Sequence, residues 1–383
     1  MKKVVFASFA KFPRGDSNAI HFVNIGSIFC DLGYDVSYLG YGSLNSNDEF
    51  GHYYSLKKTH KNSFLAKVIN HLNMGGRLCK VLKHSFNVAD VVVLSGCLKK
   101  NQFKNLRKYF LIHSPKTNFV LSMTEEYTRD EFDNFDYFVK RGFKINKYLN
   151  NEFDDKATKI LAISSYLNDK FLNKGFESLY LPFVFSDKFN QMPESVKHDK
   201  INFLYCGSPD NKDKLLEMLE AFSQLDKEFT RKIHLNLVGI NETWINERNS
   251  NLYGKLKDFA TCFGRKDYEF VRNIYAESDY SILLRDGNKT FVKAGCPTKI
   301  VESLFYGVCP VTNLTSDLGK YLEDGVNSIV VKDCSVESFE ESLINSINNF
   351  DKINNLKKNA RLTYEKHFKA SNYKDKVKEF LQL

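Results

Sequence analysis

Short apolar runs alternate along the chain with longer segments of helical periodicity, and this alternation is typical of doubly wound α/β folds with parallel sheets. In the first half, the runs predict strands at 4–10, 36–40, 91–94, 119–122, 160–163 and 179–181. In the second half, they predict strands at 203–206, 235–238, 261–263, 280–284, 310–312 and 328–331. The pattern therefore indicates two α/β domains of similar architecture.

A polar segment without clear periodicity, 183–200, separates the two sets of runs and is typical of an interdomain linker. The chain has 383 residues, which is enough for two domains that each bury a substantial core. We therefore expect an N-terminal domain at 1–185 and a C-terminal domain at 201–365. Charged helical patterns follow Ser335 and continue to the last residue.

The segment 278–331 carries the densest set of candidate functional residues. A helix is predicted to follow its first strand, with Pro297 in the first helical turn and Gly307 at the end. One face of this helix is apolar, and the opposite face carries Thr298, Lys299 and Glu302.

The polar face of this helix suits a nucleotide diphosphate. A helix N-terminus offers N–H donors and positive partial charge to a phosphate, and Lys299 adds a point charge there. Glu302, one turn further, can accept two hydrogen bonds from a ribose diol. The alternative is that Thr298, Lys299 and Glu302 form the hydrated face of a surface helix, and so short a motif does not decide between the two.

This segment resembles the donor-binding stretch of retaining GT-B-fold glycosyltransferases of the family 4 type, in a bacterial surface-polysaccharide branch with a Pro-Thr-Lys…Glu motif. Glu302 matches the second of that family's paired glutamates, which holds the nucleotide ribose. The first glutamate falls on Ala294, so the residue that holds the donor sugar stays open. The resemblance implies two Rossmann-like domains facing across a cleft, and a C-terminal helix within 366–383 that packs back on the N-terminal domain.

The turn at 206–212 is similar to that family's Gly…Lys turn. The resemblance implies that Gly207 and Ser208 line the donor, and that Lys212 stabilises the charge that the diphosphate gains as the glycosidic bond breaks. A solvated lysine at a helix start is the alternative for Lys212. The family usually has an arginine where this chain has Ser208, and Arg285, at the end of a predicted strand, is expected to supply that charge. Lys299 is the other substitute.

Other loops resemble those of the same family more weakly. Gly264 and Arg265 end a predicted strand and resemble a loop that binds the base. Gly15 and Ser17 precede the first predicted helix. The resemblance implies that they contact the transferring phosphate or the acceptor, and the alternative is that they only shape the start of the helix. Glu125 lies in a segment that looks like Thr-Glu-Trp-Tyr, and it is expected to position the sugar or the acceptor hydroxyl.

The formal net charge is +9, and the segment 56–84 is rich in lysine without any acidic residue. A basic amphipathic segment of this kind fits an anionic membrane surface, although a core-facing helix with a solvated basic side fits the same pattern. No recognition-helix or RNP-like pattern indicates nucleic acid. Neither a D-x-D triplet nor a paired-histidine motif indicates a metal site, so we expect no metal requirement.

The eight cysteines are scattered without a C-x-x-C spacing, which fits free thiols in a reducing cytosol. No run of 18 apolar residues occurs, and the first apolar run is too short for a signal peptide. We therefore expect a cytoplasmic protein, peripheral on the inner face of the cell membrane if the basic segment binds lipid.

The resemblance implies an enzyme that moves a sugar from a nucleotide-diphosphate donor, with a UDP-sugar favoured, to a glycan or polyprenyl-diphosphate-linked acceptor. Retention, no cofactor, and a place in bacterial capsule or lipopolysaccharide biosynthesis are implied in the same way. Two alternatives stay open. One is a sugar-nucleotide epimerase or hydrolase on the same fold. The other is a non-catalytic glycan- or lipid-binding relative, which the departures at Ala294 and Ser208 favour.

Overall fold

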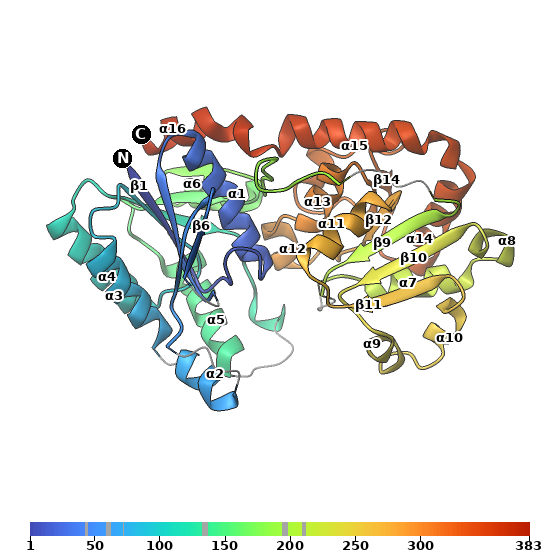
Figure 1. Ribbon diagram of the computed structural model, residues 1–383, viewed down its shortest axis with the longest axis horizontal. Coiled ribbons are helices and arrows are strands. Elements are labelled where there is room, and N and C mark those ends of the chain that lie inside the picture. Colours follow the sequence, from blue (N-terminus) through green and yellow to red (C-terminus); the bar gives the residue numbers. More distant parts are fainter. Residues whose placement is uncertain (43–44, 59–62, 72, 132–136, 194–197, 209–211) are drawn as a thin grey trace. The chain divides into compact units, whose positions relative to one another are not determined.

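The computed structural model describes residues 1–383 except 43–44, 59–62, 72, 132–136, 194–197 and 209–211 (Figure 1). The chain forms two compact units. The first consists of Met1–Phe189, Ala294–Cys296 and Ala370–Leu383, and the second of Asn190–Lys293 and Pro297–Lys369. Each unit is built on its own sheet, and the α/β fold with two parallel-sheet, Rossmann-like domains predicted from the sequence is confirmed.

The sheet of the first unit has the order β3-β4-β2-β1-β5-β6-β7-β8, and every pairing except β3 with β4 is parallel. Its strands are β1 (Lys3–Ala7), β2 (Asp35–Gly40), β3 (Ser46–Asp48), β4 (Gly51–Ser55), β5 (Val91–Leu94), β6 (Asn118–Met123), β7 (Lys159–Ala162) and β8 (Ser178–Tyr180). Its helices are α1 (Ser17–Asp31), α2 (Phe64–His71), α3 (Met74–Ser85), α4 (Lys100–His113), α5 (Tyr137–Lys147), α6 (Ser165–Asn173) and α16 (Lys374–Leu381). Short helical turns lie at Arg129–Glu131, Tyr148–Glu152 and Ala370–Tyr373.

Helices cover both faces of this sheet, because successive side chains of a strand point to opposite sides. On one side, Phe6 of β1 packs against Phe22 of α1, with ring centroids 5.3 Å apart. On the other side, Phe119 of β6 packs against Phe110 of α4 at 5.0 Å. The core on the α1 side also includes Val377 and Leu381 of α16, so the last helix of the chain belongs to the first unit.

The sheet of the second unit has the order β11-β10-β9-β12-β13-β14 and is parallel throughout. Its strands are β9 (Ile201–Cys206), β10 (Ile233–Val238), β11 (Ala260–Gly264), β12 (Tyr280–Leu283), β13 (Cys309–Thr312) and β14 (Ile329–Val330). Its helices are α7 (Leu215–Gln224), α8 (Lys227–Thr230), α9 (Glu242–Asn246), α10 (Leu252–Leu256), α11 (Tyr268–Ala276), α12 (Thr290–Ala294), α13 (Thr298–Tyr306), α14 (Val336–Asn348) and α15 (Ile353–His367). Helical turns lie at Leu318–Lys320 and Phe350–Lys352.

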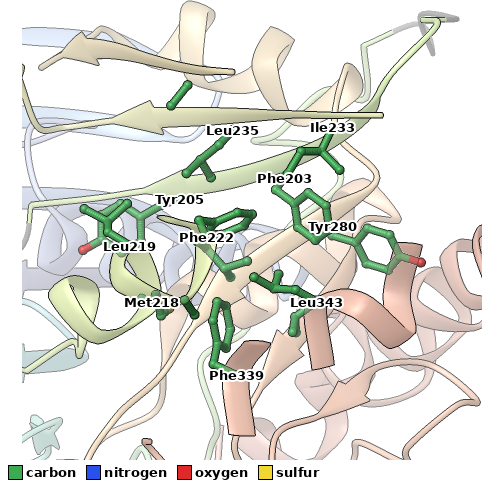
Figure 2. Packing of buried hydrophobic residues seen from close by; sticks show 14 of the residues in the cluster. Phe203, Tyr205, Met218, Leu219, Phe222, Ile233, Leu235, Tyr280, Phe339 and Leu343 are labelled. Atoms are coloured by element: carbon green, nitrogen blue, oxygen red, sulfur yellow. The ribbon is translucent and has the colours of Figure 1, made fainter. Parts of the chain in front are cut away.

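An aromatic cluster ties β9 and β12 to the helices beside them (Figure 2). Phe203 of β9 stacks on Tyr280 of β12 with ring centroids 5.1 Å apart, and Phe222 of α7 meets Phe203 edge-on at 5.4 Å. Phe339 of α14 continues the cluster against Phe222 at 6.1 Å. Buried aromatic rings contribute large apolar areas, so this packing fixes the two strands against α7 and α14.

None of the helices in the described part of the chain combines the length and the apolar character that a membrane span needs.

Candidate functional site

Three glycines line the carboxyl ends of β9, β10 and β11. Gly207, Gly239 and Gly264 all have positive φ, at 150°, 98° and 64°, a region that side-chain-bearing residues rarely adopt. Their backbones are joined, since Gly207 N donates to Val238 O at 2.9 Å and Gly239 N donates to Gly264 O at 2.8 Å. A Cβ on Gly239 would lie 2.2 Å from Gly207 O. The close approach of these turns therefore depends on glycine, at the edge where parallel sheets bind ligands.

Helix α13 begins one residue later than its sequence predicts. Pro297 is the N-cap and Thr298 the first helical residue, because ψ of Pro297 is 94° and leaves the helical region. Gly307 ends the helix with φ 65°, as predicted. Thr298, Lys299 and Glu302 are half-buried, whereas the intervening Ile300 and Val301 are buried.

The ammonium group of Lys299 is turned toward β9. It donates to the carboxylate of Asp213 and, at 3.1 Å, to the hydroxyl of Tyr205, and it lies 4.5 Å from the centroid of the Tyr205 ring. The Lys299 stem crosses Gly207 so closely that a Cβ on this glycine would lie 2.2 Å from Lys299 Cε. Its side chain is 16% exposed, which differs from a fully hydrated lysine on a surface helix.

Asp213 is the centre of a buried charge cluster. Its side chain is 1% exposed and accepts hydrogen bonds from Arg285 Nε at 2.9 Å, from Tyr205 Oη at 2.9 Å and from Lys299 Nζ. Burial alone would raise the pKa of the Asp213 carboxyl, but the charges and hydrogen bonds of Lys299 and Arg285 outweigh burial and lower it. Asp213 directly follows Lys212 but was not among the predicted site residues.

Arg285 follows β12, and its backbone is fixed on both sides. Arg285 N donates to Asn313 Oδ1 at 3.0 Å, and Asn313 Nδ2 donates back to Arg285 O at 2.8 Å. The thiol of Cys334 donates to the same carbonyl at 3.2 Å. Arg285 also bridges to Asp213 in the manner of a short antiparallel pair. The structure thus brings two sequence-predicted cations, Arg285 and Lys299, onto one carboxylate.

Residues 209–211 lie outside the described residues, and Lys212 is the first described residue after them. Its side chain is half-buried, and Nζ lies 5.8 Å from the centroid of the Phe291 ring, within the range of a cation–π contact. Ser208 is exposed at the end of the same turn. At the end of β11, Gly264 is half-buried and Arg265 is exposed.

Glu302 lies one turn into α13, where Tyr275 of α11 hydrogen-bonds to its carboxylate. Burial raises the pKa of Glu302 from its usual 4.5 to about 7, although Lys299 and Tyr275 act in the opposite direction. Tyr275 is itself buried. A carboxyl group with this pKa changes its charge near neutral pH.

Two predicted site residues of the first unit lie where the loop after β1 leads into α1. Gly15 N donates to Lys11 O at 2.8 Å, and a Cβ on Gly15 would lie 2.7 Å from the same oxygen. Asp16, and not Ser17, caps α1, because its carboxylate accepts from Ala19 N at 2.8 Å. Ser17 is the first helical residue. The helix-shaping role weighed for this loop therefore falls to Gly15 and Asp16.

Glu125 follows β6 with an exposed side chain. Its carbonyl oxygen accepts from Asn146 Nδ2 at 3.0 Å and from Asn150 Nδ2 at 3.2 Å, so α5 and the turn after it fix the loop. The neighbouring Glu126 is buried and pairs with Lys170, which gives it a structural role. The roles predicted for Gly15, Ser17 and Glu125 toward a donor or an acceptor stay predictions.

Metal-ligating side chains are dispersed. Outside the residues that the structure leaves undescribed, no three of His, Cys, Asp and Glu come together as a metal site. All eight cysteines are free thiols.

Residues 187–363 match the family model described as glycosyl transferases group 1. The matched residues make up most of the second unit. An uncharacterized glycosyltransferase of Methanocaldococcus jannaschii is 28% identical over 171 residues, which are 43% of this chain and 40% of that relative. The match thus spans less than half of the relative's length.

Solved structures show the same fold over the whole chain. Sucrose-phosphate synthase from Thermosynechococcus elongatus has a TM-score of 0.74 at 11% identity, covering 100% of this chain and 98% of that chain. WaaG, a glycosyltransferase involved in lipopolysaccharide biosynthesis, has 0.68 at 15% identity, covering 98% and 99%. Anabaena HepE in complex with UDP-glucose has 0.67 at 11% identity, covering 100% of both chains. These likenesses confirm the predicted GT-B fold class, and with the family match they support the predicted enzyme class.

Proposed function

We propose that this chain, which carries a glycosyl transferases group 1 domain within a GT-B fold, transfers a sugar from a nucleotide-diphosphate donor to an acceptor hydroxyl. The observation that carries the proposal is the grouping of Arg285, Lys299 and Glu302 at the carboxyl edge of the second sheet, with Lys212 next to Asp213 in the chain. Cations suit the diphosphate, and a carboxylate one helical turn away suits the ribose.

The leaving group explains the need for these cations. When the bond between the sugar and the diphosphate breaks, negative charge builds up on the departing phosphate oxygens. The N-terminus of α13 and the cations Lys212, Arg285 and Lys299 stabilise that charge. Glu302 accepts hydrogen bonds from the ribose hydroxyls, and the turns at Gly207, Ser208, Gly264 and Arg265 line the rest of the donor.

We also propose a specific kind of donor and a pathway for this chain. The solved HepE complex contains UDP-glucose, which favours a UDP-sugar for this chain. WaaG, a structural neighbour, takes part in lipopolysaccharide biosynthesis. We assign this chain to bacterial surface-polysaccharide assembly of the capsule or lipopolysaccharide kind, as a retaining enzyme of the family 4 type that requires no metal. The acceptor is a glycan or a polyprenyl-diphosphate-linked sugar.

In the first unit, we assign Glu125 to positioning the acceptor hydroxyl or the sugar. The anchoring of its backbone by Asn146 and Asn150 supports this assignment, because a fixed loop holds a side chain near one geometry. Gly15 and Ser17 are assigned to contact with the transferring phosphate or the acceptor on the basis of the sequence resemblance.

The basic segment 56–84 is proposed to bind an anionic membrane surface on the cytoplasmic side. Its helix α3 buries Leu78 and Leu82 in the first unit and exposes Lys80 and His84. Residues 59–62 and 72 of the segment lie outside the described residues. An anionic surface near a lipid-linked acceptor would raise the local concentration of the enzyme there.

A panel of nucleotides tests the proposed donor site. Thermal unfolding of the full chain is measured with UDP, GDP, ADP, CDP and dTDP and with their sugar forms. One diphosphate should raise the unfolding temperature, and its sugar form should show selectivity. Release of that sugar to an acceptor, and not to water alone, separates a transferase from a hydrolase or epimerase. A flat response to the whole panel contradicts the proposed donor site.

A further inference from the structure

The contacts of Asp213 point beyond the donor-binding roles assigned above. Asp213 lies between Lys212 and α7, and both of its carboxylate oxygens are occupied. Oδ1 accepts from Arg285 Nε, while Oδ2 accepts from Tyr205 Oη and Lys299 Nζ. One buried carboxylate therefore connects β9, the end of β12 and the first turn of α13.

We propose that Asp213, assisted by Tyr205, is a positioning residue that holds Arg285 and Lys299 in one geometry at the donor diphosphate. The inference rests on the proposed function, since it assumes that a diphosphate binds at this edge of the sheet. In this proposal Asp213 does not contact the donor and affects it only by holding the two cations in place.

Tyr205 provides the second support for Lys299. Its hydroxyl donates to Asp213 and accepts from Lys299 at 3.1 Å, while its ring lies beneath the ammonium group at 4.5 Å. In the described part of the chain, the hydrogen bonds of Lys299 Nζ go to Asp213 and Tyr205. An ammonium group has three N–H donors, so one stays available to a phosphate oxygen. Arg285 likewise has further N–H groups besides the Nε that binds Asp213.

The charge of the cluster argues for positioning over simple attraction. Two cations and one carboxylate leave one net positive charge, so Asp213 weakens the attraction of the site for a diphosphate. Fixing the cations offsets this disadvantage, because preorganised charges need no reorganisation as the leaving group becomes more negative. Two unpaired cations this close together would repel one another and adopt several side-chain conformations.

The substitution Asp213→Asn separates positioning of the cations from attraction of the diphosphate. The variant keeps the shape of the side chain and removes its charge, so the site gains one net positive charge. Affinity for UDP is therefore expected to stay within about threefold of the wild type or to become tighter. The rate of UDP release from UDP-glucose is expected to fall at least about tenfold, because the cations are no longer held in place. If another diphosphate stabilises the wild type more than UDP, it and its sugar form are used.

Tyr205→Phe provides an independent variant with an unchanged charge. It removes one hydrogen bond from each of Asp213 and Lys299 and keeps the ring beneath the ammonium group. UDP affinity is therefore expected to be kept, and the rate of UDP release to fall by less than in Asp213→Asn. Because the substitution is mild, it decides the question if Asp213→Asn does not fold. Asp213→Glu, which restores the charge, should recover part of the lost rate.

The two levels of the proposal fail in different ways. If the wild type binds no diphosphate of the panel, the proposed function fails and the inference fails with it. If the wild type binds UDP while the variants keep its release rate, the inference alone fails. An equal loss of affinity and rate also overturns the inference, since that result describes lost binding and no positioning.

Discussion

Lys212 and Lys214 stand two residues apart and differ in what their ammonium groups contact. Lys214 Nζ pairs with Glu217 of α7 at 2.9 Å, an ion pair between half-buried residues of neighbouring helical turns. Lys212 Nζ lies near the Phe291 ring, 5.8 Å from its centroid. This difference, which the sequence does not reveal, makes the two lysines a matched pair for testing.

Lys212→Ala is expected to lower turnover by about 10²–10³-fold, the usual effect of losing one preorganised group that stabilises charge in a transition state. Lys214→Ala should leave turnover within about threefold of the wild type, because a partly solvated i,i+3 ion pair contributes little. Steady-state kinetics with the donor that stabilises the wild type measures both. Equal effects of the two substitutions would contradict the role of Lys212.

The raised pKa of Glu302 predicts a pH dependence of nucleotide binding. The proposed ribose contact requires the carboxylate form of Glu302 as acceptor, and burial raises the pKa of this group to about 7. Affinity should therefore increase between about pH 6 and about pH 8. Glu302→Gln should bind the nucleotide about 1.5–3 kcal/mol more weakly at the upper end and show a flat profile. Calorimetric titration across this range measures both, and a profile shared by the two proteins would contradict the assignment.

The same group affects folding stability with the opposite sign. Its pKa is higher in the folded chain than the usual 4.5, so the folded state binds more protons between the two values. The contribution of Glu302 to stability is thus present below about pH 4.5 and decreases as the pH rises through about 7. Nucleotide binding and stability should respond oppositely to pH over this interval.

The site residues that could be predicted from the sequence are those whose partners lie close to them in the chain. Glu302, Lys299 and Gly307 share one helix, so periodicity and end signals place them together. Asp213 was missed because its partners Arg285 and Lys299 lie 72 and 86 positions away in the chain. No periodicity or spacing within a single chain reports a contact of that separation.

At the scale of elements, the turns after β9, β10 and β11 depend on one another. Gly239 at the middle turn has φ 98°, and a Cβ there would lie 2.2 Å from the carbonyl oxygen of Gly207. A side chain at Gly239 therefore displaces the turn that leads to Ser208. The signal for Gly239 was present in the sequence, since it directly follows the predicted strand 235–238.

Gly239→Ala is expected to destabilise the chain by at least about 1–3 kcal/mol from backbone strain alone, and to weaken nucleotide binding as the turn at Gly207 moves. Gly254→Ala is the matched control. Gly254 lies inside α10 and a Cβ there meets nothing within 4 Å, so alanine should stabilise the chain by about 0.4–1 kcal/mol. Thermal unfolding with and without nucleotide measures both, and similar shifts for the two variants would contradict the argument.

Most strands were predicted where an apolar run is buried on both faces. β3 and β4 were missed because they form the edge of the first sheet without a buried apolar run. Ser46–Asp48 is polar and exposed throughout, and Gly51–Ser55 buries only Tyr53. The predicted strand 4–10 ends early, at Ala7, because Ser8 turns the chain: its Oγ accepts from Ala10 N at 3.0 Å. Edge strands and local side-chain hydrogen bonds carry weak sequence signals.

At the scale of the whole molecule, the basic segment predicts membrane binding. Lys58 and Lys80 are both exposed, and each cation near an anionic bilayer contributes about 1 kcal/mol. Lys58→Glu with Lys80→Glu should therefore reduce sedimentation with vesicles rich in phosphatidylglycerol at least about tenfold. Lys376→Glu with Lys378→Glu, on exposed positions of α16, makes the same change of net charge elsewhere.

Binding that falls equally in both double variants would show a general charge effect and contradict a specific role of the segment. Binding to neutral vesicles of phosphatidylcholine serves as the reference, since the electrostatic contribution vanishes there.

The return of the chain to its first unit has a consequence for its synthesis. Val377 and Leu381 complete a core that otherwise ends at Phe189, and about 180 residues separate the two parts. At about 5–20 residues per second, a ribosome needs about 10–40 s to make that stretch. During this interval the apolar side of α1 has no cover from α16. The core of the first unit can therefore be completed only after the second unit's chain has been made.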